Sequence, residues 1–191
     1  MPKLISRGKI KLENLYRTMH WADVNYRNKN HGLLRLQYWI HLLKRPASVL
    51  EIGCGNGKLC KLLSDMGYDV TGLDIVDGPY DRPYNFVKHD ITLGRLPFKD
   101  DEFDYVVSFD VLEHLPPKWI EEAIWDIFRV SHTVVLGVCC QPRAILHLTI
   151  KPPEWWLEKL NRLCPGSADR SFKIINTRTK DERFIFYANK T

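Results

Sequence analysis

The stretch that decides the fold is Val49-Leu50-Glu51-Ile52-Gly53-Cys54-Gly55-Asn56-Gly57. Its apolar start predicts a buried strand, and the glycines predict a tight turn that leads directly into a helix over about 58–66. Gly67 closes this helix, and Asp69-Val70-Thr71-Gly72-Leu73-Asp74 predicts a second strand. Together these elements form one βαβ unit, the building block of a parallel sheet.

The residues of this turn disfavour the dinucleotide fingerprint and do not fit a phosphate-binding P-loop. The dinucleotide fingerprint places glycines at i, i+2 and i+5, whereas here they fall at i, i+2 and i+4, with Lys58 at the next position. A phosphate-binding P-loop needs Ser or Thr after its lysine, and Lys58 is followed by Leu59. Glycines in this turn still allow a ligand to lie against the backbone, where a Cβ atom would collide.

Strands and helices alternate on both sides of this unit. Apolar residues at helical spacing predict helices over 33–43 and 119–128, and short apolar runs predict strands over 85–88, 103–109 and 133–138. Such alternation is typical of a parallel sheet with helices on both faces.

Two alternating segments near the C-terminus, 172–177 and 182–187, have the spacing of a hairpin. We therefore predict an α/β fold with a doubly wound, seven-stranded, mostly parallel sheet (Rossmann-like) that ends in a C-terminal antiparallel β-hairpin.

Length and composition favour one compact intracellular domain. The chain has 191 residues, of which 45% are hydrophobic and 27% charged, as in ordinary globular proteins. None of its five cysteines forms a C-x-x-C pair, so neither a zinc site nor a disulfide framework has its usual spacing. No apolar run reaches the roughly 18–20 residues that span a bilayer, and the N-terminus lacks an apolar signal core. We expect a cytoplasmic protein without membrane insertion.

Basic charge is concentrated at the N-terminus. Residues 1–45 contain ten lysines and arginines but only Glu13 and Asp23 as acids, a net charge of +8 in a chain whose total is +5. We therefore divide the chain into a basic N-terminal arm with lid helices, residues 1–45, and a domain over residues 46–191. Such an arm can meet phosphate groups of a nucleic acid, or it can simply be a solvated leader.

Three motifs carry a resemblance to a known family. Glu51-x-Gly53-x-Gly55-x-Gly57, the acid after the second strand in Gly72-Leu73-Asp74, and Phe109-Asp110-Val111-Leu112-Glu113-His114-Leu115 resemble the class I S-adenosylmethionine-dependent methyltransferases in order and spacing. The resemblance covers roughly residues 47–138. It implies a methyltransferase with S-adenosyl-L-methionine as cofactor and S-adenosylhomocysteine as product.

The resemblance also implies which residues hold the cofactor. An acid at Asp74 typically binds both ribose hydroxyls, an acid at Asp90 typically bonds the adenine amino group, and Glu51 suits the ammonium group. By this resemblance the expected cofactor-binding residues are Glu51, Gly53, Cys54, Gly55, Gly57, Asp74, Ile75, Asp90, Ile91, Phe109, Asp110 and Val111. Cys54 occupies a position that the family fills with small residues, so we interpret it as packing rather than as a nucleophile.

Methyl transfer needs positioning more than it needs a strong base, because the cofactor is already activated. Where the acceptor must lose a proton, His114 after the fourth strand and His147 after the fifth are the catalytic candidates, although both can be structural. We expect no metal, since no partner of Asp110 and Glu113 can be placed from spacing. A metal-dependent catechol type does exist in the resembled family.

Residues outside the core must select the methyl acceptor. Trp155 and Trp156, near the start of a helix that Pro153 can open, and Trp21 and Tyr26 in the aromatic N-terminal region are the candidates for substrate binding. As alternatives, tryptophans at such a place anchor a helix to the sheet, and the N-terminal aromatic residues form a lid over the cofactor.

Three functions remain open from the sequence. The first is transfer of a methyl group to an oxygen or nitrogen of a small-molecule or saccharide acceptor. The second is an RNA or DNA methyltransferase that uses the basic arm, but the fourth strand lacks the Asp/Asn-Pro-Pro-Tyr/Phe motif that grips a planar base. The third is a non-catalytic scaffold that binds S-adenosylmethionine. The methylated atom, the oligomeric state and any partner protein are not determined by the sequence.

Overall fold

The structure is a computed structural model that describes residues 13–14, 16–17, 30–77, 82–131, 133–141, 146–164, 172–175 and 183–188. Its described strands are β1 (Ser48–Ile52), β2 (Asp69–Asp74), β3 (Asn85–Lys88), β4 (Tyr105–Phe109), β5 (Val134–Cys139), β6 (Lys173–Ile175) and β7 (Arg183–Ala188). The described α-helices are α3 (His31–Leu34), α4 (Leu36–Trp39), α5 (Lys58–Asp65), α6 (Ile120–Val130) and α7 (Pro153–Leu163). Short 3₁₀ helices are η2 (Ile40–Leu42), η3 (Leu112–His114) and η4 (Pro117–Trp119).

The described strands form one seven-stranded sheet in the order β3-β2-β1-β4-β5-β7-β6. The first five are parallel, and β7 is antiparallel to both β5 and β6. The predicted doubly wound sheet with a C-terminal antiparallel hairpin is therefore confirmed. From β1 the chain adds β2 and β3 on one side of the sheet, and then β4 and β5 on the other side. The switch point between β1 and β4 leaves a crevice at the carboxyl ends of these strands, where ligands bind in folds of this type.

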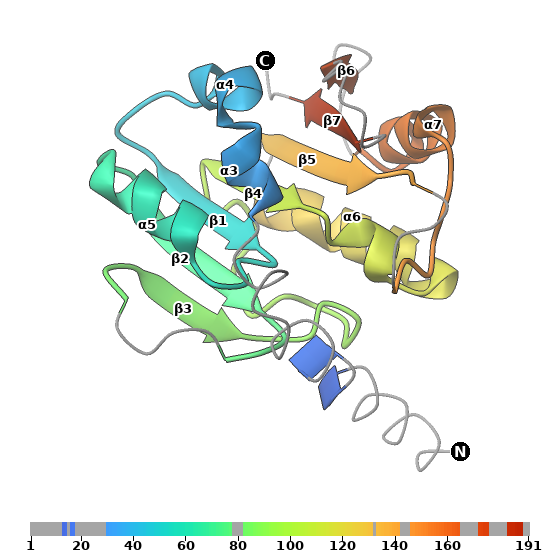
Figure 1. Ribbon diagram of the computed structural model, residues 1–191, viewed down its shortest axis with the longest axis horizontal. Helices are drawn as coiled ribbons and strands as arrows, with labels where there is room; N and C mark the ends of the chain where they lie inside the picture. The colour runs from blue at the N-terminus through green and yellow to red at the C-terminus, as the bar shows by residue number, and fades with distance from the viewer. Residues whose placement is uncertain are drawn as a thin grey trace.

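Helices cover both faces of the sheet (Figure 1). One hydrophobic cluster joins α4 and α5 to alternate strand residues such as Val49 and Val107, and the other joins α6 and α7 to their neighbours Leu50 and Val106. Every residue of β5 is buried, as expected for a strand that lies inside such a sheet. Among the described helices, none has both the length and the apolar composition needed to cross a bilayer.

The predicted helix over 33–43 is interrupted in the structure. Arg35 lies between α3 and α4 with φ −117°, and its backbone N–H donates to the carbonyl of Gly32. The apolar periodicity still places Trp39 in the core with no exposed surface, where its Nε1 donates to the Gly32 carbonyl at 3.0 Å. Residues 31–42, counted above with the N-terminal arm, thus pack on the sheet.

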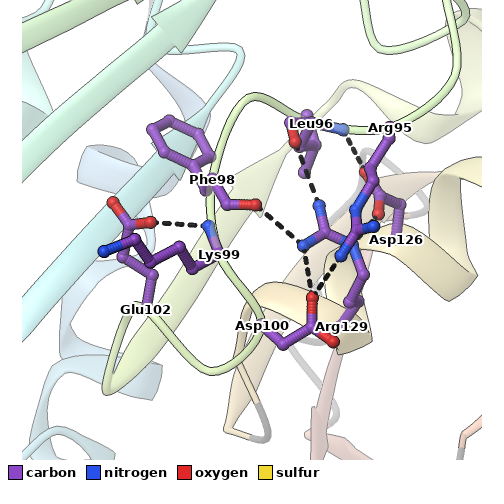
Figure 2. Close-up of polar contacts among 8 residues, drawn as sticks. All are labelled: Arg95, Leu96, Phe98, Lys99, Asp100, Glu102, Asp126 and Arg129. Carbon is purple, nitrogen blue, oxygen red and sulfur yellow. Dashed lines mark hydrogen bonds and ion pairs between the residues drawn. The ribbon is translucent and has the colours of Figure 1, made fainter.

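A buried ion pair between Arg129 and Asp126 fixes the loop between β3 and β4 (Figure 2). Arg129 of α6, with a side chain that is 4% exposed, pairs with Asp126 and donates to the carbonyls of Leu96 and Phe98 at 3.0 and 2.8 Å. Asp126 in turn accepts the backbone N–H of Leu96. One guanidinium therefore satisfies several buried acceptors of a loop that has no regular structure of its own.

Replacing this guanidinium tests how much the loop depends on it. Arg129→Met leaves the Asp126 carboxylate buried without its cation, so we expect the free energy of unfolding to fall by about 3–5 kcal/mol. Arg95→Met is the matched control, because Arg95 is 66% exposed where it meets Asp100 and such pairs contribute little. Urea unfolding measures both variants, and equal small changes would contradict a structural role of Arg129.

Candidate functional site

A cavity of about 180 Å³ lies at the carboxyl ends of β1, β2 and β4, at the switch point of the sheet. Most of the residues that the sequence predicted for the cofactor line it. They are Glu51, Gly53, Cys54, Gly55, Asp74, Ile75, Asp90, Ile91, Phe109, Asp110 and Val111, and the catalytic candidate His114 lines the same cavity.

Other predicted residues do not line this cavity. Gly57 has φ +70° at the start of α5, and a Cβ atom there would meet the Tyr84 hydroxyl at 1.6 Å, so Gly57 shapes the turn. Trp156 has no exposed surface in the core, and Trp155 packs against its ring with centroids 5.0 Å apart. Both tryptophans thus anchor α7, as in the alternative given above. Trp21 and Tyr26 lie outside the described residues.

The turn after β1 is held open by its glycines. Gly53 has φ +74°, and a Cβ atom there would lie 2.2 Å from Val111 Cγ2. Gly55 has φ +51°, a conformation that L side chains rarely adopt, and a Cβ atom on it would meet nothing within 4 Å. Backbone N–H groups of Gly53 and Cys54 both donate to the Leu73 carbonyl, at 2.7 and 3.1 Å. The turn is therefore fixed against β2 while its middle faces open space.

Asp74 connects this turn to the end of β2. Its Oδ2 accepts the Gly55 N–H at 2.8 Å and its Oδ1 accepts the Val76 N–H at 3.0 Å. Burial raises the pKa of the Asp74 carboxyl, and the backbone N–H groups that it accepts act in the opposite direction. Each carboxylate oxygen has a second lone pair, so the side chain can hold the turn and accept hydrogen bonds from a ligand as well.

Glu51 is the more strongly perturbed carboxyl. It is 3% exposed, and burial raises its pKa to about 8, although hydrogen bonds from Cys60 and Asn30 act against this shift. The Cys60 thiol donates to Oε2 at 2.9 Å. The raised pKa means that Glu51 holds a proton at neutral pH in this structure. A cationic ligand group in the cavity would favour the ionised carboxylate.

The third predicted acid, Asp90, follows β3. Its Oδ1 accepts both the backbone N–H and the hydroxyl of Thr92, at 2.9 and 2.7 Å. This arrangement is the Asx turn that a short acid forms at the end of a strand, and it orients the carboxyl beside the cavity.

Sequence reasoning missed several residues of the cavity wall. Asn30 caps α3 by accepting the Leu33 N–H at 2.8 Å, and the next residue, His31, lies with Nε2 3.4 Å from Asp110 Oδ2. The cap signal Asn30-His31-Gly32 was readable in the sequence, but only tertiary packing shows that it borders the cavity. The other lining residues that the sequence did not single out are Ile52, Asn56, Leu73, Val76, His89 and Leu115. Tyr16, one of the N-terminal aromatic residues considered for a lid, lines the cavity as well.

His114 and His147 are neighbours in the structure. Their ring centroids lie 4.6 Å apart at an interplanar angle of 82°, and Tyr16 meets His114 edge-on at 5.5 Å. The aromatic N-terminal region therefore reaches the cavity through Tyr16. Glu113, between η3 residues Leu112 and His114, joins this group: one ligand atom from each of Glu113, His114 and His147 lies within 4.8 Å of the others. Spacing in the sequence did not place this cluster.

Comparison with known proteins identifies the family. Residues 20–167 match a family model described as a methyltransferase domain, which is more than half of the chain. The chain therefore belongs to the class I S-adenosylmethionine-dependent methyltransferases, as the motifs indicated. S-adenosylmethionine is the cofactor of this family, and the residues present fit it: the open glycine turn, the buried Glu51 and the half-buried Asp74 border one cavity.

Curated relatives match part of the chain. A ubiquinone biosynthesis O-methyltransferase of Shewanella halifaxensis is 32% identical over 92 residues, or 42% of this chain and 39% of that protein. A probable S-adenosylmethionine-dependent methyltransferase of Mycolicibacterium smegmatis is 38% identical over 115 residues, or 52% of this chain and 43% of that protein. The chain thus spans about two-fifths of the length of these relatives.

A solved structure matches nearly the whole fold. The 1,6-didemethyltoxoflavin-N1-methyltransferase of Burkholderia thailandensis, with bound 1,6-didemethyltoxoflavin and S-adenosylhomocysteine, superposes with a TM-score of 0.68. The superposition covers 97% of this chain and 90% of that one at 17% identity, which shows the shared fold.

The raised pKa of Glu51 predicts a pH effect on stability. Between the ordinary carboxyl value of 4.5 and the folded value of about 8, the folded chain holds a proton that the unfolded chain releases. The resulting stabilisation is complete below the unfolded pKa and is lost as pH rises through the folded pKa. Raising pH from 6 to 8 should therefore cost about 2 kcal/mol of unfolding free energy, a loss that Glu51→Gln should remove.

Urea unfolding of the wild type and Glu51→Gln at pH 6, 7 and 8, without added ligand, measures the effect. The difference between the two slopes isolates the Glu51 contribution from other titrating groups. Parallel pH profiles would show that Glu51 is ionised throughout.

Proposed function

We propose that this chain binds S-adenosylmethionine in the cavity and transfers its methyl group to a hydroxyl oxygen of a small-molecule acceptor. The observation that carries the proposal is the convergence of Glu51, Asp74 and Asp90 from three strands on one cavity beside the glycine turn. These are the acids that the family motif assigns to the cofactor. The curated relatives named as O-methyltransferases support oxygen as the methylated atom.

Each acid suits one part of the cofactor. Asp74, already oriented by two backbone N–H groups, is placed to accept the two ribose hydroxyls, and Asp90 to accept the adenine amino group. The ammonium group would lie against Glu51, whose ionised form it favours. Gly55 then borders the cofactor with no Cβ in the way.

The acceptor would enter from the side of the cavity bordered by Tyr16 and His114. Catalysis is an in-line displacement, in which the acceptor oxygen loses its proton to solvent or a basic side chain and bonds to the methyl carbon. The electron pair of the broken carbon–sulfur bond stays on sulfur, so the sulfonium becomes the neutral sulfide of S-adenosylhomocysteine. The chain's task is to hold oxygen and methyl group about 3–3.5 Å apart and in line.

The rings beside His114 support a small molecule as the acceptor. Tyr16 and the loop that carries His147 stand next to His114, so aromatic and imidazole rings bound this side of the site. The basic residues behind the nucleic-acid alternative lie mostly outside the described residues, and that alternative stays a prediction.

Calorimetric titration with S-adenosylmethionine and S-adenosylhomocysteine tests the cofactor half of the proposal. Asp74→Ala should weaken binding of both by about 2–4 kcal/mol, or roughly 30- to 1000-fold in Kd, because charge-assisted hydrogen bonds are lost. Asp77→Ala is the matched control, since Asp77 is an exposed acid just after β2. Equal affinity of Asp74→Ala and wild type would place the ribose elsewhere.

An assay of S-adenosylhomocysteine release tests the acceptor half. With hydroxylated small molecules, saccharides, amine analogues and RNA supplied in parallel, we expect turnover with hydroxylated small molecules. Turnover confined to the amines would move the methylated atom to nitrogen. Turnover confined to RNA would favour the nucleic-acid alternative.

A further inference from the structure

The cluster of Glu113, His114 and His147 has the composition of a metal site. Two imidazoles and one carboxylate offer three ligand atoms that all lie within 4.8 Å of one another. His114 lines the cavity, so the cluster stands at the side of the site where the acceptor would enter. Two histidines with one carboxylate are a ligand set that zinc and iron enzymes use for catalytic sites with open coordination positions.

The ring of His114 is oriented for ligation. Its Nδ1 lies 3.0 Å from the carbonyl oxygen of Leu146, and because a carbonyl can only accept, Nδ1 carries the proton. The lone pair of the ring is therefore on Nε2. A histidine that donates one ring N–H to a backbone carbonyl and offers the other nitrogen is the usual arrangement at protein metal sites, because the carbonyl fixes both tautomer and orientation.

The side chain of Glu113 is also held in place by a hydrogen bond. The residue has no exposed surface, and its Oε1 accepts the backbone N–H of Cys139 at the end of β5, at 2.9 Å. This contact orients the carboxylate and engages one of its two oxygens. A divalent cation at the other oxygen would favour the ionised form of the carboxylate.

The backbone brings the third ligand to the other two. The carbonyl oxygen of Glu113 accepts the N–H groups of both Leu148 and Thr149 at 2.9 Å, and the Thr149 hydroxyl donates to the Leu115 carbonyl at 2.7 Å. These bonds attach the segment after His147 directly to η3. The proximity of His147 to His114 thus follows from several backbone bonds rather than from one side-chain contact.

We propose that Glu113, His114 and His147 bind one divalent first-row cation, of the Mn²⁺, Co²⁺ or Zn²⁺ type, which holds the acceptor oxygen in front of the methyl group. The cation site stands on its own observations, while its role with the acceptor rests on the proposed function. Ligand atoms at about 2.1 Å from one ion lie roughly 3–3.5 Å apart, so ligand atoms that now lie within 4.8 Å of one another would move closer together on binding. Three protein ligands leave coordination positions for the acceptor and for water.

Such a cation gives the site a means of activating a hydroxyl without a strongly basic side chain. A bound cation lowers the pKa of a hydroxyl that it contacts, so the acceptor releases its proton near neutral pH. His114 and His147 then act as ligands instead of the general bases considered from the sequence. An oxygen acceptor suits these ions, so the cation site agrees with the hydroxyl acceptor of the proposed function, on which it rests.

Titration of the untagged full chain with Co²⁺, followed by visible absorption, and with Mn²⁺, followed by calorimetry, tests the cation site without any acceptor. We expect one ion per chain. His147→Ala and Glu113→Gln should each weaken binding at least about tenfold. His41→Ala is the matched control, because His41 is an exposed histidine of η2 outside the cluster and should leave ion binding unchanged.

Two further measurements distinguish loss of cation binding from misfolding and from loss of cofactor binding. Melting temperatures report whether Glu113→Gln folds, and His147→Gln repeats the test at a side chain that is only partly buried. S-adenosylhomocysteine affinity should be unchanged in His147→Ala, because His147 does not line the cavity.

Each outcome decides one claim. Absence of ion binding by a wild type that binds S-adenosylhomocysteine would overturn the cation site and leave the proposed function standing. Equal ion binding by wild type and cluster variants would also overturn the site, since the ion would then lie elsewhere. Ion binding that depends on the cluster, in a chain that binds no S-adenosylhomocysteine, would support the cation site and contradict the proposed function.

Discussion

The cavity depends on the hydrogen bonds that attach the glycine turn after β1 to the end of β2. Asp74 Oδ2 accepts the Gly55 N–H, and the Leu73 carbonyl accepts two further N–H groups of the same turn. Without these bonds the turn could collapse over the carboxyl ends of the strands, where positive φ values at Gly53 and Gly55 hold it open. The acid that the family uses for its cofactor is therefore also part of the scaffold that shapes the site.

The same region carries an electrostatic cost. Glu51 is buried and Asp74 is half-buried, and the pKa of each carboxyl is raised because desolvation disfavours the charged form. A cofactor with an ammonium and a sulfonium group compensates this cost, since positive charge stabilises ionised carboxylates. The two carboxyls thus favour a cationic ligand, in agreement with the cofactor of the family to which the chain belongs.

Most of the fold could be predicted from the sequence because local patterns and tertiary packing agree. The strands over 69–74 and 85–88 have the predicted bounds, and the helix predicted over 58–66 ends one residue earlier. The prediction of one continuous helix over 33–43 was wrong, because the structure interrupts it at Arg35. This break comes from local backbone hydrogen bonds that apolar spacing does not encode. In the confirmed C-terminal hairpin, β7 lies between β5 and β6.

The candidate site also has one part that the sequence predicted and another that it did not. Motif residues near the glycine turn line the cavity because they follow the strands whose carboxyl ends meet there. The cluster of Glu113, His114 and His147 could not be predicted, since its third member lies more than thirty residues along the chain and is brought in by backbone bonds to Glu113. Trp155 and Trp156 were candidates for substrate binding from the sequence, whereas in the structure they pack in and against the hydrophobic core.

A crystal structure of the chain with S-adenosylhomocysteine tests most directly whether this cavity is the cofactor site. The account predicts density for the ligand along the glycine turn, with both ribose hydroxyls within hydrogen-bond distance of the Asp74 carboxylate and the ammonium group facing Glu51. Density for the ligand at another place on the molecule, or a ribose that makes no contact with Asp74, would contradict the account.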